Sequence, residues 1–341
     1  MIFGAQNLKI TGLVIGHLVV AFSSSAIAED YILRMSTGSL SGTSYAVGKT
    51  IAATISKPQE DSELSCDKGG TCGVPGLLVI VQTSEGSAQN LAGLQNAAID
   101  MALVQSDLAY WAFMGDELYS RREPFAHLRA IGYLYSKVLQ VITNRDSPIK
   151  RLSDLRGRRV SLGALQSGTV VNARQVLQSF GFKETDLKAY LMNTDSSIDG
   201  LLSGQLDALF LMSGAPTPGI EFLQSEMQIR LLSLDQNIVN SLLSVNAYFT
   251  PKTIPAGTYI GIPDVSTVSV GTLLLVGAHL ENDMVYDMTR ALWHESNRRF
   301  LLAGPEKSAI FTAEKAIRNV PIPFHDGALK YYQDRALLPS D

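Results

Sequence analysis

The sequence predicts an α/β protein built as two lobes. Apolar runs typical of strands alternate with helical patterns along most of the 341 residues, which is the arrangement of α/β folds. Several of these runs end in a short loop of small polar residues that also begins a helix. One series of such units lies in the first third of the chain and a second begins near Val160, so we expect two lobes with separate sets of loops.

The most regular unit spans residues 34–55. Its loop, residues 36–45, consists mainly of Gly, Ser and Thr, and Val47, Ile51 and Ile55 then recur at every fourth position, as in a helix packed on a sheet. Backbone N–H groups and the positive end of the helix dipole meet at such a loop, which suits a carboxylate or another anion. The glycine spacing fits neither a Walker loop nor a dinucleotide fingerprint. Loops of this composition also serve as ordinary connections.

Other predicted strands end in the same way. Residues 77–81 form a continuous apolar run, which predicts a strand buried on both faces, and Ser87 is expected to cap the following helix. Residues 100–104 lead into Gln105 and Ser106 at the start of another helix. Ligands in open α/β sheets bind outside the carboxyl ends of the strands, so these loops should gather along one edge.

The second series contributes two more loops. Residues 166–169 begin a helix that reaches Phe180, and residues 213–216 follow a strand at residues 208–212. Arg174, inside the first of these helices, could reach a ligand carboxylate or could form an ion pair at the surface.

Three further segments complete the pattern. Residues 128–135 and 138–144 have the composition of two separate strands. Residues 251–263 contain three prolines and three glycines, which predicts a long loop.

The amino terminus has the three parts of a secretory signal peptide. Lys9 supplies positive charge, residues 10–22 form an apolar segment, and Ala26-Ile27-Ala28 fits the small-residue cleavage site. We therefore expect a signal peptide at residues 1–28, cleavage after Ala28 and a periplasmic product. The alternative, an uncleaved anchor, needs about 20 apolar residues, which is more than this segment has.

The two cysteines of the chain, Cys66 and Cys72, lie close together in a polar, Gly-rich stretch. In an oxidising compartment two such thiols are expected to form a local disulfide, which would stabilise the fold by about 2 kcal/mol. A zinc site would need more ligands than these two.

Charge and motif content favour binding over catalysis. The chain has 28 basic and 32 acidic residues without a basic stripe, so no nucleic-acid partner is expected. None of the five histidines stands in a metal-ligand spacing, and no Gly-x-Ser-x-Gly nucleophile motif is present. We expect no catalytic residues, no metal and no cofactor.

Eight stretches, taken together and in order, resemble the TAXI family of solute receptors from TRAP transporters. They cover nearly all of the chain after residue 28 and comprise residues 36–55, 83–91, 104–110, 149–160, 167–169, 204–210, 254–259 and 321–325. The chain departs from the family pattern at Leu40, where the family often has Gly, and at Ala46, where it often has Pro.

The resemblance implies a two-lobed periplasmic binding protein of type II-like fold, with the ligand in the cleft and two crossover strands as the hinge. The crossovers would be residues 138–142 and 268–274. Lobe 1 would contain residues 29–138 plus 270–341, and lobe 2 residues 139–269.

The resemblance also implies what the protein binds. The expected solute is a small carboxylate such as glutamate, glutamine or 2-oxoglutarate, which a monomeric receptor would deliver to a sodium-coupled TRAP permease. The expected ligand-binding residues come from the strand-to-helix loops of both lobes: Gly38, Ser41, Gly42, Thr43, Tyr45, Ser84, Ser87, Gln105, Ser106, Ser167, Gly168, Thr169, Gly214 and Ala215.

Two other functions fit the same fold. A periplasmic small-acid dehydratase would need a positioned acid or base, and Asp107 and Glu85 are the loop carboxylates that could serve. A receptor for an ABC importer or a sensor kinase would use the same cleft with a different partner.

Overall fold

A computed structural model of the chain describes residues 1–2, 31–57, 72–304 and 311–339. Nearly all of the expected signal peptide and Cys66 lie outside these ranges, so cleavage after Ala28 and the Cys66–Cys72 disulfide stay predictions. Among the described helices, none has both the length and the apolar character needed to cross a membrane.

The described strands form one continuous hydrogen-bonded sheet. Its order is β3-β2-β4-β1-β5-β12-β6-β9-β7-β8, with β10 added to β6 and β11 to β12. The strand bounds are β1 Tyr31–Ser36, β2 Ser56–Lys57, β3 Val74–Pro75, β4 Leu77–Gln82, β5 Met101–Gln105, β6 Leu128–Asn144, β7 Arg159–Ser161, β8 Lys188–Tyr190, β9 Ala208–Ser213, β10 Ile229–Leu231, β11 Thr250–Ile254 and β12 Val265–Gly277.

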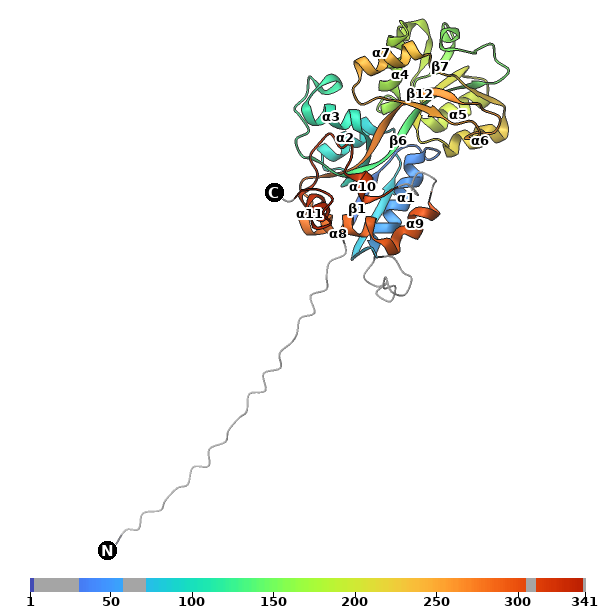
Figure 1. Cartoon of the computed structure of the whole chain (residues 1–341). Helices are drawn as coiled ribbons and strands as arrows, with labels where there is room; N and C mark the ends of the chain where they lie inside the picture. Colours follow the sequence, from blue (N-terminus) through green and yellow to red (C-terminus); the bar gives the residue numbers. More distant parts are fainter. Residues whose placement is uncertain (3–30, 58–71, 305–310, 340–341) are drawn as a thin grey trace.

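Helices cover both faces of this sheet in two groups. In Figure 1, α4 to α7 surround the upper part of the molecule, whereas α1, α8, α9 and α11 surround the lower part. The α-helix bounds are α1 Thr43–Ile55, α2 Ser87–Gln95, α3 Ser106–Met114, α4 Gly168–Ser179, α5 Thr194–Leu202, α6 Pro218–Glu226, α7 Gln236–Val245, α8 Asn282–Trp293, α9 Arg298–Ala303, α10 Ala313–Ala316 and α11 Asp326–Asp334. Short 3-10 helices lie at Glu117–Tyr119, Leu152–Leu155, Glu184–Asp186 and Glu295–Asn297.

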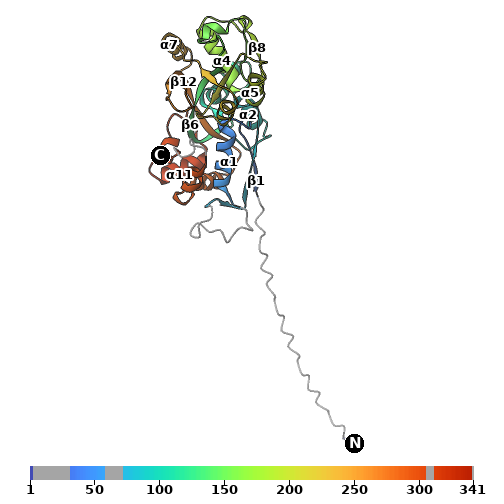
Figure 2. The same ribbon diagram turned by 90° about the vertical axis from the view of Figure 1, so that its right-hand side faces the viewer.

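Two long antiparallel strands, β6 and β12, connect the two groups. The end of β12, from Thr272 to Val276, pairs with β5, whereas β6 from Val138 to Thr143 pairs with β9. Each long strand therefore belongs to the sheet of one lobe at one end and of the other lobe at its other end. The second view, in Figure 2, also places α1 and α11 in one lobe and α4, α5 and α7 in the other. The predicted α/β fold with two lobes is confirmed.

Each lobe has a separate apolar core on each face of its sheet. In the first lobe, Ile51 and Met288 belong to one core and Trp111 to the other. In the second lobe, Val176 belongs to one core and Ile220 to the other. The lobes are thus three-layered. The hinge strands, polar contacts and the ring contact of Tyr110 with Tyr248 join them.

Three local predictions were wrong. Residues 128–144 form one strand, because the polar residues between the two apolar runs continue the pairing with β12. In β4, Leu78 and Ile80 are 40 % and 44 % exposed, because alternate side chains point away from the core that covers one face. The predicted loop at 251–263 begins with strand β11, and its Pro251 is tolerated because β11 is an edge strand.

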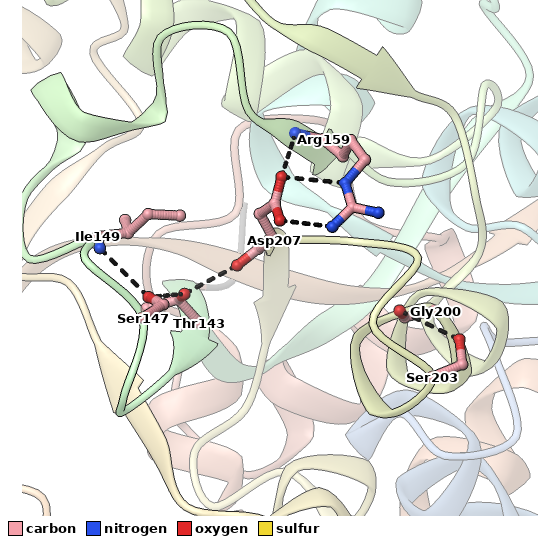
Figure 3. A network of polar contacts seen from close by, with 7 residues as sticks. All are labelled: Thr143, Ser147, Ile149, Arg159, Gly200, Ser203 and Asp207. Atoms are coloured by element: carbon pink, nitrogen blue, oxygen red, sulfur yellow. Dashed lines mark hydrogen bonds and ion pairs between the residues drawn. The ribbon is translucent and has the colours of Figure 1, made fainter.

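A polar cluster fixes the ends of three strands in the second lobe (Figure 3). The Asp207 carboxylate accepts hydrogen bonds from Arg159 Nη2 at 2.7 Å and from its backbone N–H at 2.8 Å. The carbonyl of Asp207 accepts from Thr143 Oγ1 at 2.8 Å. These bonds tie β7, β9 and β6 together.

Asp207→Asn is expected to lower the melting temperature at pH 7. The expected loss in the free energy of unfolding is about 1 kcal/mol, because the ion pair is partly exposed. Hydrogen bonds from Arg159 hold the pKa of the Asp207 carboxyl below its usual value. The contribution is therefore complete above the pKa of the unfolded chain and is lost as pH falls through the folded pKa. Thermal unfolding at pH 7 and in strong acid should show a difference that disappears in acid, whereas exposed Asp199→Asn should change little.

Candidate functional site

The loops at the carboxyl ends of the strands enclose a cavity of about 40 Å³ between the lobes. The first lobe contributes the ends of β1, β4 and β5, and the second those of β7, β8 and β9, with β6 between them. The lining residues are Thr37, Gly38, Ser39, Gly42, Ser44, Glu85, Gly86, Ser87, Gln105, Lys137, Ser167, Gly168, Thr169, Thr194, Leu211, Met212 and Ser213.

Four helices begin at this cavity. The N-cap residues of α1, α2, α3 and α4 are Gly42, Gly86, Gln105 and Ser167, and all four line it. Gly86 has a φ of 134° and a side chain there would meet Ser167 of the opposite lobe, so glycine is required at this position. The positive ends of four helix dipoles therefore converge from both lobes, which favours a bound anion.

Lys137 places a cation in the same cavity. It lies on hinge strand β6 and is only 7 % exposed. Among the described residues, none forms a hydrogen bond or ion pair with its ammonium group. Burial lowers the pKa of Lys137 to about 8, although the nearby Asp107 charge opposes the shift. A buried cation without a partner is costly, and an anion in the cavity would compensate it.

The lobes touch along the loop that precedes α1. The Ser41 N–H donates to Asp195 Oδ1 at 3.0 Å, and the Ser41 carbonyl accepts from the Gly219 N–H at 2.9 Å. The Thr43 hydroxyl donates to the Gly214 carbonyl at 3.0 Å. Some groups of this loop that were expected to bind the ligand thus form hydrogen bonds with the opposite lobe.

A second contact joins α2 to the loop before α4. The N–H groups of Ala88 and Gln89 both donate to the Gln166 carbonyl at 3.1 Å. The Gln166 N–H in turn donates to Glu85 Oε2 at 3.2 Å. Glu85 therefore has a lobe-to-lobe partner at the edge of the cavity.

The third contact is a buried polar network around Asp107 of α3, which is fully buried. Its carboxylate accepts from Asn172 Nδ2 at 3.0 Å and from Asn246 Nδ2 at 3.3 Å, both in the second lobe. Gln105 Nε2 donates to Asn172 Oδ1 at 2.7 Å. Burial raises the pKa of Asp107, and these hydrogen bonds oppose the shift.

These contacts define a closed conformation. A water molecule needs roughly 10–15 Å³ of such space, so the cavity of about 40 Å³ holds only a few water-sized groups. Typical sites for larger ligands measure about 300–1,000 Å³. A solute the size of glutamate would require the lobes to stand farther apart.

Sequence comparison identifies the family. The model of the NMT1-like family matches residues 35–335. The chain belongs to the NMT1-like family.

Solved structures resemble this NMT1-like protein at low identity. The aliphatic sulphonate binding protein SsuA from Escherichia coli has 14 % identity and a TM-score of 0.42, with 89 % of this chain and 82 % of that chain covered. The alkanesulfonate-binding protein SsuA from Xanthomonas axonopodis pv. citri, bound to MOPS, has 14 % identity and a TM-score of 0.45, with 92 % and 96 % covered. The periplasmic binding protein BugD has 10 % identity and a TM-score of 0.49, with 90 % and 98 % covered.

Seven of the residues predicted to bind ligand line the cavity of the NMT1-like protein. They are Gly38, Gly42, Ser87, Gln105, Ser167, Gly168 and Thr169. Their contact with a ligand stays a prediction. Ser87 is not the helix cap that the sequence suggested, because α2 begins at Ser87 itself and its hydroxyl accepts from the Gln105 N–H at 3.1 Å.

The other predicted residues lie elsewhere. Ser41, Thr43 and Gly214 take part in contacts between the lobes, as described above. The Ser84 N–H donates to the Gly38 carbonyl, and the Tyr45 ring lies 6.0 Å from Lys49 Nζ. Three more residues are not among those that line this cavity: Ser106, Ala215 and the family-atypical Leu40, which is 62 % exposed.

Ten residues that line the cavity were not predicted to bind ligand, and Lys137 is the cation among them. Its signal is a single charge between apolar runs that were themselves predicted to be strands. A charge in a buried strand needs a partner or a function, so this position could have been selected from the sequence.

The carboxylates of the dehydratase alternative differ in position. The Asp107 carboxylate lies within the interlobe network rather than at the cavity, whereas Glu85 lines the cavity. Arg174 forms an ion pair with Glu184 at 2.8 Å. Of the two alternatives for Arg174, a ligand carboxylate or an ion pair at the surface, the structure shows the ion pair. Within the described ranges, no cluster of three or more His, Cys, Asp or Glu side chains could hold a metal.

Proposed function

We propose that this protein is an extracytoplasmic solute receptor that closes its lobes over a small organic anion and presents it to a membrane transporter. The observation that carries the proposal is Lys137, a buried cation in the interlobe cavity that has no hydrogen-bond or ion-pair partner among the described residues. A ligand carboxylate would pair with Lys137 and accept from the helix starts of both lobes. Closure is favoured because the ligand contacts both lobes.

The resemblance to TAXI receptors supports a finer assignment. The solute would be a small carboxylate, with glutamate, glutamine and 2-oxoglutarate as the reference compounds, and the transporter a sodium-coupled TRAP permease. Sodium-dependent uptake into vesicles that contain the permease and this receptor tests the partner. Uptake driven by ATP instead would assign the receptor to an ABC importer.

Titration calorimetry on protein refolded free of ligand tests the binding function. The panel should contain short monocarboxylates, dicarboxylates, amino acids and a sulfonate, each at pH 7. At least one anion is expected to bind with a saturable isotherm, and its uncharged amide should bind far more weakly. Absence of binding across the panel would contradict the proposal.

The affinity for the anion is expected to fall as pH rises above about 8. The pKa of Lys137 in this site is lowered to about 8, so the ammonium is lost in that range rather than near 10.5. A bound anion raises this pKa, so the dissociation constant should rise up to tenfold per pH unit between the two values. Below the lower pKa the affinity should be constant. Lys137→Arg should bind with no decline up to pH 10, since guanidinium stays charged.

A further inference from the structure

A second hollow lies across the hinge strands from the interlobe cavity. One part has a volume of about 400 Å³ and an adjoining part about 290 Å³, and both are lined by Tyr133 and Ser136 of β6. We call the two parts together the hinge cavity. Its volume lies in the range of about 300–1,000 Å³ that is usual for small-molecule sites.

The two cavities lie on opposite faces of the same strands. Ser136 lines the hinge cavity, whereas the next residue, Lys137, lines the interlobe cavity. Successive side chains of a strand point to opposite faces. At the end of β5, Gln105 likewise lines the interlobe cavity and the next residue, Ser106, lines the hinge cavity.

The walls of the hinge cavity come from both lobes. Ser106 and Val320 belong to the first lobe, and Tyr248 and Thr250 to the second. Rotation about the hinge that brings the lobes together on one face separates them on the other. The closed conformation, with its small interlobe cavity, is therefore the one in which the hinge cavity is open.

The larger part is built to hold a ring. Its lining combines apolar surfaces such as Tyr248 and Val320 with hydroxyl groups, and none of its described lining residues is charged. Ser106 is 4 % exposed, and within the described part of the chain its hydroxyl has no hydrogen-bond partner. Gly271 lets Tyr133 and Ser106 approach the strand, because a side chain at 271 would meet both.

The smaller part supplies positive charge. Lys252 of β11 and Lys315 of α10 line it from opposite lobes, and its lining includes no acidic side chain from the part of the chain that the structure describes. The Tyr133 hydroxyl lies 2.7 Å from Ser136 Oγ where the two parts meet. A ring in the larger part would thus place a carboxylate substituent toward two lysines.

We infer that the hinge cavity is a second binding site, for an aromatic carboxylate, distinct from the interlobe site. Ser106 would hydrogen-bond to a polar group on the ring, and Lys252 and Lys315 would pair with the carboxylate. Such a ligand fits between the lobes only when the interlobe cavity is closed, because opening that cavity narrows the hinge cavity, so the ligand stabilises the closed conformation. The site does not depend on which solute the interlobe cavity takes.

Calorimetry and amide NMR with 4-hydroxyphenylacetate test this inference directly. Saturable binding with a dissociation constant of about 1 mM or tighter is expected, the range that a ring-sized ligand can reach. Amide shifts should centre on Gly271, Tyr133 and Thr250. Shifts confined to Gly38 and Gly168, or no saturation by about 10 mM, would overturn the inference.

Two variants make the test specific. Thr250→Trp places a ring at an exposed wall position and should weaken binding at least tenfold, whereas Gln236→Trp at an exposed position of α7 should not. Lys252→Gln combined with Lys315→Gln should weaken 4-hydroxyphenylacetate about tenfold but leave neutral 4-hydroxybenzyl alcohol unchanged. Equal affinity of the acid for the wild type and both variants would overturn the site, and melting temperatures verify that each variant is folded.

Discussion

Lys137→Met is expected to reduce the affinity for the anionic solute by about 100-fold while making the folded protein more stable. The lost interaction is a charge-assisted hydrogen bond, worth roughly 1.5–3 kcal/mol, in a site that excludes water. Met fills a similar volume, so the loss reports the charge rather than the packing. Calorimetry with the best anion of the panel measures the affinity.

The gain in stability has the same origin. A pKa lowered from 10.5 to about 8 corresponds to a cost on the order of 3 kcal/mol for holding the ammonium in this site. Met removes that cost, so denaturant unfolding without ligand should show Lys137→Met to be more stable by about 1–3 kcal/mol. The exposed Lys188→Met should change neither quantity. If Lys137→Met bound the anion with the affinity of the wild type, Lys137 would not be part of the anion site.

Asp107→Asn is expected to shift the protein toward an open conformation and to weaken anion binding about 10- to 100-fold. The carboxylate accepts hydrogen bonds from four donors, including Asn172 and Asn246 of the opposite lobe. An amide places an NH2 group against one of these donors, and an unsatisfied buried donor costs roughly 1–3 kcal/mol. Loss of the charge also lowers the pKa of Lys137, so the deficit should be larger at pH 8 than at pH 6.

A double-mutant cycle separates this network from general destabilisation. Asp107→Asn and Asn172→Ala should each raise the radius of gyration in small-angle scattering. Their effects on anion affinity should be non-additive, because both remove the same lobe-to-lobe contact. Exposed Asp116→Asn should leave the scattering curve unchanged. Additive effects, or an unchanged radius of gyration, would show that Asp107 does not hold the lobes together.

The elements of this fold were predictable from the sequence because their signals are local. The apolar run 208–212 is too short for a typical helix and therefore indicates a strand. The topological rule then places the loops at one edge. The same rule predicted that Gln105 and Ser167 belong to one site, and both line the interlobe cavity although they come from different lobes.

Side-chain directions at the hinge were not predictable in this way. Pairing of β12 with β6 shifts register on either side of Leu273 and Leu274, and each shift changes which β6 side chains share a face. Sequence alternation alone therefore could not assign Ser136 and Lys137 to their cavities. The hydrogen bonds of Asp107 with Asn172 and Asn246 join residues 65 and 139 positions apart, so no local sequence pattern predicts them.

The position of Lys137 also governs how the receptor behaves without solute. The polar groups of the two lobes satisfy one another when the lobes meet, so these contacts by themselves would permit closure on an empty cavity. Closure without an anion leaves the Lys137 ammonium away from water and, among the described residues, without a hydrogen bond or ion pair, whereas closure on an anion pairs it. Lys137 therefore attracts the solute and also disfavours the closed conformation of the receptor without solute. A transporter that recognises the closed conformation would then rarely bind a receptor that carries no solute.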